Sequence, residues 1–232
     1  MIADKATDTR DSVRELQRAL YRAAKADAAR RFHALYDKVY REDVLRRAWQ
    51  EVKANAGAAG VDGQTIKGIE HSGVEAFLAA LATELREGTY RPHPVRRVRI
   101  PKADGRERVL GIPAVRDRVV QAAAKVVLEP VFEADFRSSS YGFRPKRNAH
   151  QALEVIRQAV NHGQNWVLDA DIAAFFDEID GAVLDQLVAR RICDRRLQKL
   201  LRQWQRAGAL DGDDFVPTEQ GISQGSVISP LL

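Results

Sequence analysis

The segment that decides the fold reads Val167-Leu168-Asp169-Ala170-Asp171-Ile172-Ala173-Ala174-Phe175-Phe176-Asp177. Its start, from Trp166 to Ala170, is apolar and predicts a short buried strand. Asp169 and Asp171 are two residues apart, so both carboxylates point to one face of an extended strand. A carboxylate at the end of a buried strand is costly unless it holds a cation or a hydrogen-bond partner. Paired oxygens of this kind bind Mg²⁺ at sites of phosphoryl transfer, and aspartates that only cap a turn are the alternative.

A second motif lies further along the chain, from Glu219 to Leu232. Its two glycines, Gly221 and Gly225, let the backbone approach a flat or phosphorylated ligand closely. The run then becomes apolar, which predicts the start of a buried helix. A glycine-rich loop with Ser226 as a helix N-cap explains most of the same pattern.

The sequence before Trp166 predicts helices and one hairpin. Apolar residues at helical spacing are Val13, Leu16, Leu20 and Ala23; Phe32, Leu35, Tyr36 and Val39; Val44, Leu45, Ala48, Trp49 and Val52; and Phe77, Leu78, Leu81 and Leu85. We expect Asp43 to cap the third helix, and Ser72 with Glu75 to form a capping box for the fourth. Residues 95–110 read strand, turn, strand, with Asp104-Gly105 at the tip.

The following helix carries Val119, Ala123, Val126 and Val127, and it is expected to end near Glu129 because Pro130 follows. Three more helices are predicted, one capped by Asn148, one capped by Asp180, and one without a predicted cap. Their inward residues are Ala152, Leu153 and Ile156, then Val183, Leu184 and Leu187, then Leu197, Leu200, Leu201 and Trp204. Asp211-Gly212 reads as a second hairpin tip. Helices and strands that are partly segregated along the chain predict an α+β fold.

Composition excludes several classes of protein. The 232 residues are 45% hydrophobic and 30% charged, which excludes disordered, collagen-like and coiled-coil chains. The uncharged stretches are too short to span a membrane, and the first residues lack a signal-peptide pattern. The lone cysteine, Cys193, permits no internal disulfide and is expected in the core. We therefore expect a reducing compartment, the cytoplasm.

The net charge of +5 is concentrated in two places. Residues 91–118 hold nine Arg and Lys against three acids, and such a patch favours a polyanion. The second cluster, which faces only Asp194, is Arg190, Arg191, Arg195, Arg196, Lys199, Arg202 and Arg206. A solvated helix face explains this second cluster equally well.

Together these segments resemble the reverse transcriptases encoded by group II introns. The similar blocks are Arg31 to Asp37, Asn55 to Gly63, Ile100 to Gly105, Arg108 to Arg118, Ser140 to Pro145, the Asp171 segment (polymerase motif A) and the Gln224 segment (motif B). They follow the family's order from Phe32 to the last residue. The resemblance implies a right-hand polymerase, with helical fingers and a β-hairpin over residues 1–165 and an incomplete palm over residues 166–232.

For function, the resemblance implies RNA-directed DNA polymerase activity with Mg²⁺, dNTPs, and an RNA template with a DNA primer. It also implies binding of structured intron RNA and help with splicing. Asp171 would be the catalytic metal ligand, with the carbonyl of Ile172 beside it. Phe176 would exclude a 2′-hydroxyl, while Phe175 is expected in the core. The nucleotide would be held by Lys102, Arg108, Phe176, Gln224 and Gly225, and the RNA or template by Arg96, Arg97, Arg99, Tyr141, Gly142, Phe143 and Arg144.

The sequence departs from the family pattern in one important respect. Val109, Ile222, Ser223 and Ser226 are mild departures, but no Tyr-x-Asp-Asp occurs in the 232 residues. Gly212-Asp213-Asp214 is no substitute, because it precedes motif B. Two-metal catalysis needs carboxylates from both motifs, so we expect this chain to be inactive by itself. The alternatives are a non-catalytic RNA-binding fingers module and a decayed mobile-element remnant; the oligomeric state stays open.

Overall fold

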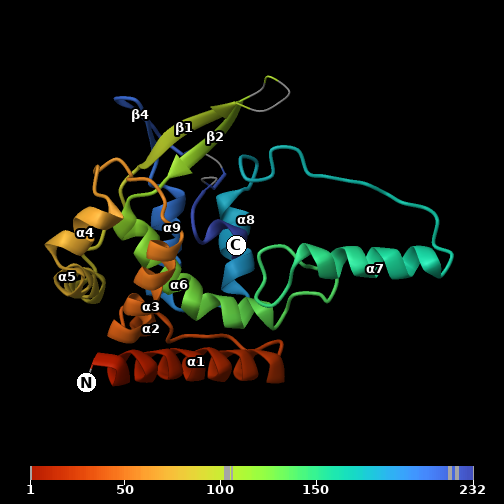
Figure 1. Ribbon diagram of the computed structural model, residues 1–232, viewed down its shortest axis with the longest axis horizontal. Helices are drawn as coiled ribbons and strands as arrows, with labels where there is room; N and C mark the ends of the chain where they lie inside the picture. Colours follow the sequence, from red (N-terminus) through yellow and green to blue (C-terminus); the bar gives the residue numbers. More distant parts are fainter. Residues whose placement is uncertain (1, 102–104, 106, 219–220, 223–224, 232) are drawn as a thin grey trace.

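The computed structural model describes residues 2–101, 105, 107–218, 221–222 and 225–231, with side chains from Ser12 onward. It is a mixed α and β structure, which confirms the expected fold class. Helix α6 (Val115–Glu133) lies at its centre, buried on nearly every side. Apolar residues cover most of the circumference of this helix, and such a helix is expected in the core. It packs against α1 (Ile2–Ala26), α2 (Tyr36–Val39) and α3 (Glu42–Ala54) (Figure 1).

Two helices extend this core, and one small sheet joins the halves of the chain. Helices α4 (Ile66–Ser72) and α5 (Val74–Glu87) pack beside α3, where the rings of Trp49 and Phe77 meet edge to face. The strands are β1 (Val95–Pro101), β2 (Glu107–Ile112), β3 (Ala209–Asp211) and β4 (Asp214–Val216), in the order β2-β1-β3-β4. Strand β1 pairs antiparallel with β2 and parallel with β3. The predicted hairpin tip at Asp211-Gly212 is confirmed.

One buried carboxylate ties the second half of the chain to the first. Asp194 is the N-cap of α9 (Arg195–Gln205), which follows α8 (Gly181–Ala189). Its second oxygen accepts the backbone N–H groups of Leu35 and Tyr36, both at 2.8 Å. Asp194 therefore satisfies the orphan donors of two segments at once.

Helix α6 continues through a proline, so the expected end near Glu129 is wrong. Pro130 lies inside the helix, which runs to Glu133. A proline cannot donate to the carbonyl four residues before it, here that of Val126. The side-chain amide of Gln17 in α1 donates to this carbonyl instead, at 3.2 Å. Because Pro130 is buried and the Val126 carbonyl has a replacement donor, the helix continues beyond the proline.

Two predicted caps are also wrong. Helix α3 begins at Glu42 after Arg41, so Asp43 lies in its first turn, where it pairs with Arg41. Ser72 does not start a helix, because it is the last residue of α4, a helix that sequence periodicity missed. Gly73, at φ +108°, separates α4 from α5, and no side chain caps α5.

Helix α7 (Ala149–Asn161) forms where expected but buries no side chain. Its capping box between Asn148 and Gln151 is present, yet Leu153 and Ile156 are more than half exposed. The predicted strand at 166–170 does not form, and Trp166 is 99% exposed. A strand needs a paired neighbour, and the four strands of the described sheet pair only with one another. Figure 1 shows α7 and the stretch after it extending away from the body of the molecule.

Smaller differences affect the remaining elements. In α8 only Leu184 and Val188 are buried, while the predicted inward residues Val183 and Leu187 are half exposed. The helix expected after Gly225 is absent from the described residues 225–231, which hold one 3₁₀ turn, η1 (Ser229–Leu231). Cys193 is only partly buried rather than a core residue. None of the described helices is long and apolar enough to cross a membrane.

Candidate nucleotide and RNA site

The motif A segment is an irregular loop over Asp169–Asp177. Both Asp169 and Asp171 are exposed, and Ile172 is 67% exposed. Among the described residues, no three His, Cys, Asp or Glu side chains gather closely enough to hold a metal ion. A single exposed carboxylate does not form a complete Mg²⁺ site. The metal role of Asp171 and Ile172 therefore stays a prediction.

The two neighbouring phenylalanines have different surroundings. Phe176 is partly buried and packs against the hydrophobic core. Phe175 is 48% exposed, so the expectation that it is a core residue is wrong. The two rings meet edge to face, with centroids 5.3 Å apart. Phe176 is thus contacted from two sides, by the core and by the ring of Phe175.

Motif B docks on motif A through backbone groups. The N–H of Ile222 donates to the carbonyl of Phe176 at 2.8 Å, and the N–H of Gly221 donates to the carbonyl of Ile179 at 3.0 Å. A Cβ atom on Gly221 would lie 2.6 Å from the carbonyl oxygen of Phe176, and Gly221 has φ +84°. Only glycine meets both demands. The sequence predicted that Gly221 lets the backbone approach a ligand. In the structure it lets motif B approach motif A.

A buried glutamine of α6 holds the next part of motif B. The side-chain oxygen of Gln121 accepts the Ser226 hydroxyl at 3.0 Å and the Val227 N–H at 3.2 Å. Gly225, at φ +106°, lies against the carbonyl of Gly111 in β2, where a Cβ would be 2.6 Å from that oxygen. Motif B is thereby joined to the fingers hairpin and to α6. Gln224 lies outside the described residues.

Two of the hairpin arginines, Arg96 and Arg99, have partners within the protein. Arg96 donates to the carbonyl of Ala59 at 2.8 and 3.1 Å, which fixes the loop between α3 and α4. Arg99 forms a bidentate ion pair with Asp211, between β1 and β3. Arg97 is partly buried and Arg108 is exposed. Lys102 lies outside the described residues, and the nucleotide and RNA roles of this hairpin stay predictions.

The loop before α7 is shaped by its own arginine. Arg144 is buried, forms a bidentate ion pair with Glu133 at 2.7 and 3.0 Å, and donates to loop carbonyls. Next to it Phe143 has φ +54° and is 81% exposed. The guanidinium of Arg147 covers the ring of Tyr141, 5.1 Å from its centroid. Arg144 therefore fixes a loop in which Gly142 and Phe143 are exposed and Tyr141 is partly covered by Arg147, and the template contacts stay predictions.

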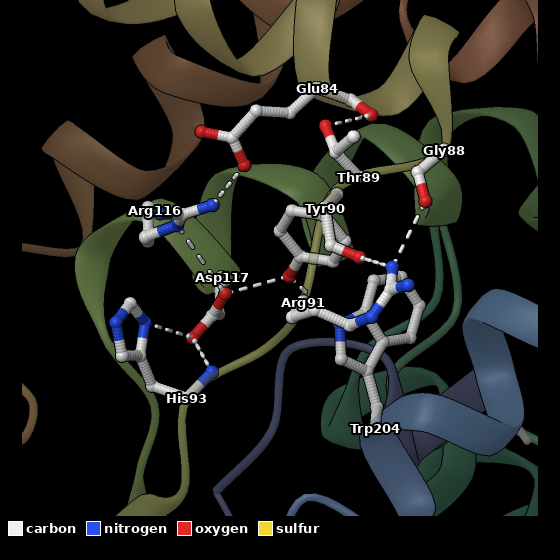
Figure 2. Close-up of polar contacts among 9 residues, drawn as sticks. All are labelled: Glu84, Gly88, Thr89, Tyr90, Arg91, His93, Arg116, Asp117 and Trp204. Carbon is white, nitrogen blue, oxygen red and sulfur yellow. Dashed lines mark hydrogen bonds and ion pairs between the residues drawn. The ribbon is translucent and has the colours of Figure 1, made fainter.

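Sequence analysis missed a buried polar network between the hairpin and α6 (Figure 2). The Tyr90 hydroxyl donates to Asp117 Oδ1 at 2.7 Å, and the His93 N–H donates to Asp117 Oδ2 at 3.0 Å. Trp204 Nε1 of α9 donates to the Tyr90 hydroxyl at 3.2 Å. Arg116 pairs with Glu84 of α5 and lies 4.0 Å from Asp117 Oδ1. One aspartate thus connects α5, α6, α9 and the entry to β1.

Burial controls the ionisation of this network. Desolvation raises the pKa of Asp117, and the hydrogen bonds from Tyr90 and His93 oppose part of that rise. Desolvation, followed by the charge of Asp117, raises the pKa of Tyr90 well above its usual value. A cavity of about 20 Å³ beside His93, Asp117 and Gln121 has room for about one water molecule.

A sequence signal for this network exists. Asp117 and Gln121 are four residues apart, so they share one face of a helix that is mostly apolar. Polar residues at that spacing on a buried helix indicate hydrogen bonding to neighbouring segments, because an unpartnered buried polar group is costly.

Comparison with known proteins identifies the family. Residues 100–232, more than half of the chain, match the family described as reverse transcriptase (RNA-dependent DNA polymerase). The chain belongs to the group II intron reverse transcriptases. This reverse transcriptase chain is 38% identical over 226 residues to Protein YkfC of Escherichia coli, covering 95% of the chain and 59% of YkfC. It is 34% identical over 204 residues to the group II intron-encoded protein LtrA of Lactococcus lactis, covering 87% of the chain and 33% of LtrA.

A solved structure shares the fold. The partial Cas6-RT-Cas1–Cas2 complex matches with a TM-score of 0.54 at 23% identity, over 86% of this chain and 33% of that one. The reverse transcriptase chain thus spans about three fifths of YkfC and a third of LtrA. It represents part of the length of the proteins that it resembles.

Proposed function

We propose that this chain supplies the fingers, residues 1–165, and the first part of the palm, residues 166–232, of an RNA-directed DNA polymerase that copies an RNA template. The observation that carries the proposal is the docking of motif B on motif A, through Ile222 N–H and the Phe176 carbonyl. It brings together the two segments that the resemblance assigns to the incoming nucleotide. Structured intron RNA, whose folding and splicing the protein assists, and a template–primer duplex are the proposed partners, in the cytoplasm.

The proposed reaction joins a dNTP to the 3′-hydroxyl of a DNA primer. Phe176, held by the core on one side and Phe175 on the other, is the group that rejects a 2′-hydroxyl. Lys102 and Arg108 neutralise the triphosphate, while Gln224 and Gly225 lie under the new base pair. Mg²⁺ is the proposed cofactor, and Asp171 with the Ile172 carbonyl supplies part of its ligands. The described residues lack the remaining carboxylates, so we propose that these residues alone do not catalyse the reaction.

Primer extension tests this proposal in a longer protein, in which residues 1–232 are followed by an aromatic-Ala-Asp-Asp segment and its palm. We expect extension by the longer protein with Mg²⁺ and none by residues 1–232 alone. Asp171→Ala should abolish extension and leave RNA affinity intact. Asp213→Ala is the matched control, since Asp213 lies at an exposed hairpin tip before motif B. Extension that survives Asp171→Ala, or is lost with Asp213→Ala, contradicts the assignment.

A second function is favoured by one observation, that no three metal-ligating side chains gather among the described residues. In this alternative the fingers bind structured RNA by phosphate contacts and shape, without catalysis. The two functions are distinguished by the longer protein. RNA binding with no primer extension at any Mg²⁺ concentration supports the binding module and rejects the polymerase.

A further inference from the structure

Helix α9 carries a row of cations along one face. Arg195, Lys199 and Arg202 of the helix and its C-cap residue Arg206 follow one another at four, three and four residues. At 3.6 residues per turn they lie within about 60° of one another around the axis, over a length of about 16 Å. The opposite face packs into the core through Leu197, Leu200 and Leu201. The helix is therefore anchored on one side and presents a continuous positive edge on the other.

Most of this row has no acidic partner. Only Arg202 pairs with a carboxylate, that of Asp185 at 3.4 Å. Arg195, Lys199 and Arg206 are exposed, and no carboxylate of a described residue lies within 4.0 Å of their nitrogens. Arginines of α3 and α7 pair with carboxylates of their own helix, as Arg46–Glu42, Arg47–Glu51 and Arg157–Glu154 show. The row on α9 differs from these two helices, on whose exposed faces charges of both signs alternate.

The row begins at the N-terminus of α9, where a cation lowers the stability of the helix. A helix N-terminus carries partial positive charge, so a cation in the first turn is unfavourable. Arg196, the second residue of α9, is compensated: it lies 4.3 Å from the Tyr36 ring centroid and donates to the carbonyl of Arg86 at 2.8 Å. Arg195, the first residue, has no such contact with the described residues. A local rule broken without a structural gain is typical of a functional surface.

We propose that this face of α9, defined by Arg195, Lys199, Arg202 and Arg206, binds the phosphate backbone of structured RNA. Three of the four cations are arginines, whose guanidinium groups match phosphate oxygens better than a lysine does. A row about 16 Å long can contact several phosphates of one strand, since a double helix such as DNA carries one phosphate per strand about every 3.4 Å of its axis. This surface is separate from Arg96 and Arg99 of the hairpin, whose guanidinium groups are engaged by Ala59 and Asp211. The inference rests on the RNA-binding part of the proposed function and names where on the chain that binding occurs.

The test compares the salt dependence of RNA binding in two charge-matched variants of the 232-residue chain. Glutamine has nearly the helix propensity of arginine and lysine, so Arg195→Gln/Lys199→Gln/Arg206→Gln should keep α9 folded. Binding of a fluorescein-labelled RNA hairpin is followed by anisotropy at a series of KCl concentrations. The slope of log affinity against log salt should fall by about 2 to 3, because each lost phosphate contact removes about 0.9. The control, Arg47→Gln/Lys53→Gln/Lys67→Gln, loses the same charge from α3 and α4 and should keep the wild-type slope.

Each outcome decides a different point. If the wild type binds and both variants keep its slope, the α9 surface is wrong while RNA binding stands. If the wild type does not bind the hairpin, the RNA-binding part of the proposed function fails, and this inference fails with it. Arg195→Lys/Arg206→Lys keeps both charges and should keep the slope. If circular dichroism shows that the triple variant is unfolded, Lys199→Gln alone is tested in its place. The slope of log affinity against log salt should then fall by about 1. Displacement of the RNA by poly-glutamate at equal charge overturns the assignment to phosphate and favours an acidic protein.

Discussion

Replacing Tyr90 by phenylalanine removes one oxygen from the centre of the polar network. The Tyr90 hydroxyl donates to Asp117 at 2.7 Å and accepts from Trp204 Nε1 at 3.2 Å, while Tyr90 itself is 2% exposed. A hydrogen bond to a charged group contributes about 1.5–3 kcal/mol, and a donor left without an acceptor costs about 1 kcal/mol more. We therefore expect Tyr90→Phe to lower the free energy of unfolding by about 2–4 kcal/mol at pH 7.

The free energy of unfolding lost in Tyr90→Phe should also depend on pH, and the pKa of Asp117 determines whether the loss grows or shrinks as pH rises. Its folded pKa is already above the ordinary 3.8, because burial disfavours the carboxylate. The folded protein therefore binds this proton more tightly than the unfolded chain, and stability falls as pH rises from 3.8 through the folded pKa. The Tyr90 hydrogen bond limits that fall by favouring the carboxylate. Without it the folded pKa rises further, so the deficit of the variant should grow between pH 4 and pH 7.

Urea unfolding followed by tryptophan fluorescence measures both effects. Tyr21→Phe removes the same atom from a partly exposed ring on α1 and should change the free energy of unfolding by less than about 0.5 kcal/mol. A Tyr90→Phe deficit below about 1 kcal/mol at pH 7, or one that is constant from pH 4 to pH 7, refutes the reasoning about Asp117.

Two further predictions concern backbone packing. Gly221→Ala places a Cβ 2.6 Å from the Phe176 carbonyl at φ +84°, whereas Gly88→Ala, at φ +77° after the core helix α5, meets nothing within 4 Å. Urea unfolding should show a loss of about 1–2 kcal/mol for Gly88→Ala and a further ~1–3 kcal/mol for Gly221→Ala; equal losses contradict the docking of the two motifs. Gln17→Ala leaves the Val126 carbonyl unpaired and should cost about 1 kcal/mol. In a Pro130→Ala background the backbone restores that bond, so the same change should cost less than about 0.5 kcal/mol, and additive losses in this double-mutant cycle would reject the compensation.

Local signals in the sequence predicted the elements whose ends are determined locally. Asn148 and Asp180 begin helices where expected, because each supplies the side-chain cap that a helix N-terminus needs. Periodicity likewise found the buried faces of α3 and α9. These features depend on residues within a turn or two of one another.

Features that depend on distant partners escaped prediction. No residue near Pro130 in the sequence indicates that Gln17, more than a hundred residues earlier, replaces the missing hydrogen bond. The strand expected at 166–170 lacks a neighbouring strand among the described residues, and its apolar side chains are exposed. In the candidate site, the motifs were found from their residue types. The docking of Gly221 against Phe176 required the structure, since it joins segments about 45 residues apart.

Helix α7 has a consequence for the way the molecule opens. It forms its own backbone hydrogen bonds and buries no side chain, so almost nothing outside the helix holds it closed. An isolated helix of 13 residues is marginal in water. Amide hydrogens of α7 should therefore exchange through local fraying, while those of α6 wait for the cooperative opening of the whole core. The free energy of opening α7 is therefore separate from the free energy of unfolding the core. A single free energy of unfolding measured for the chain describes the helices around α6.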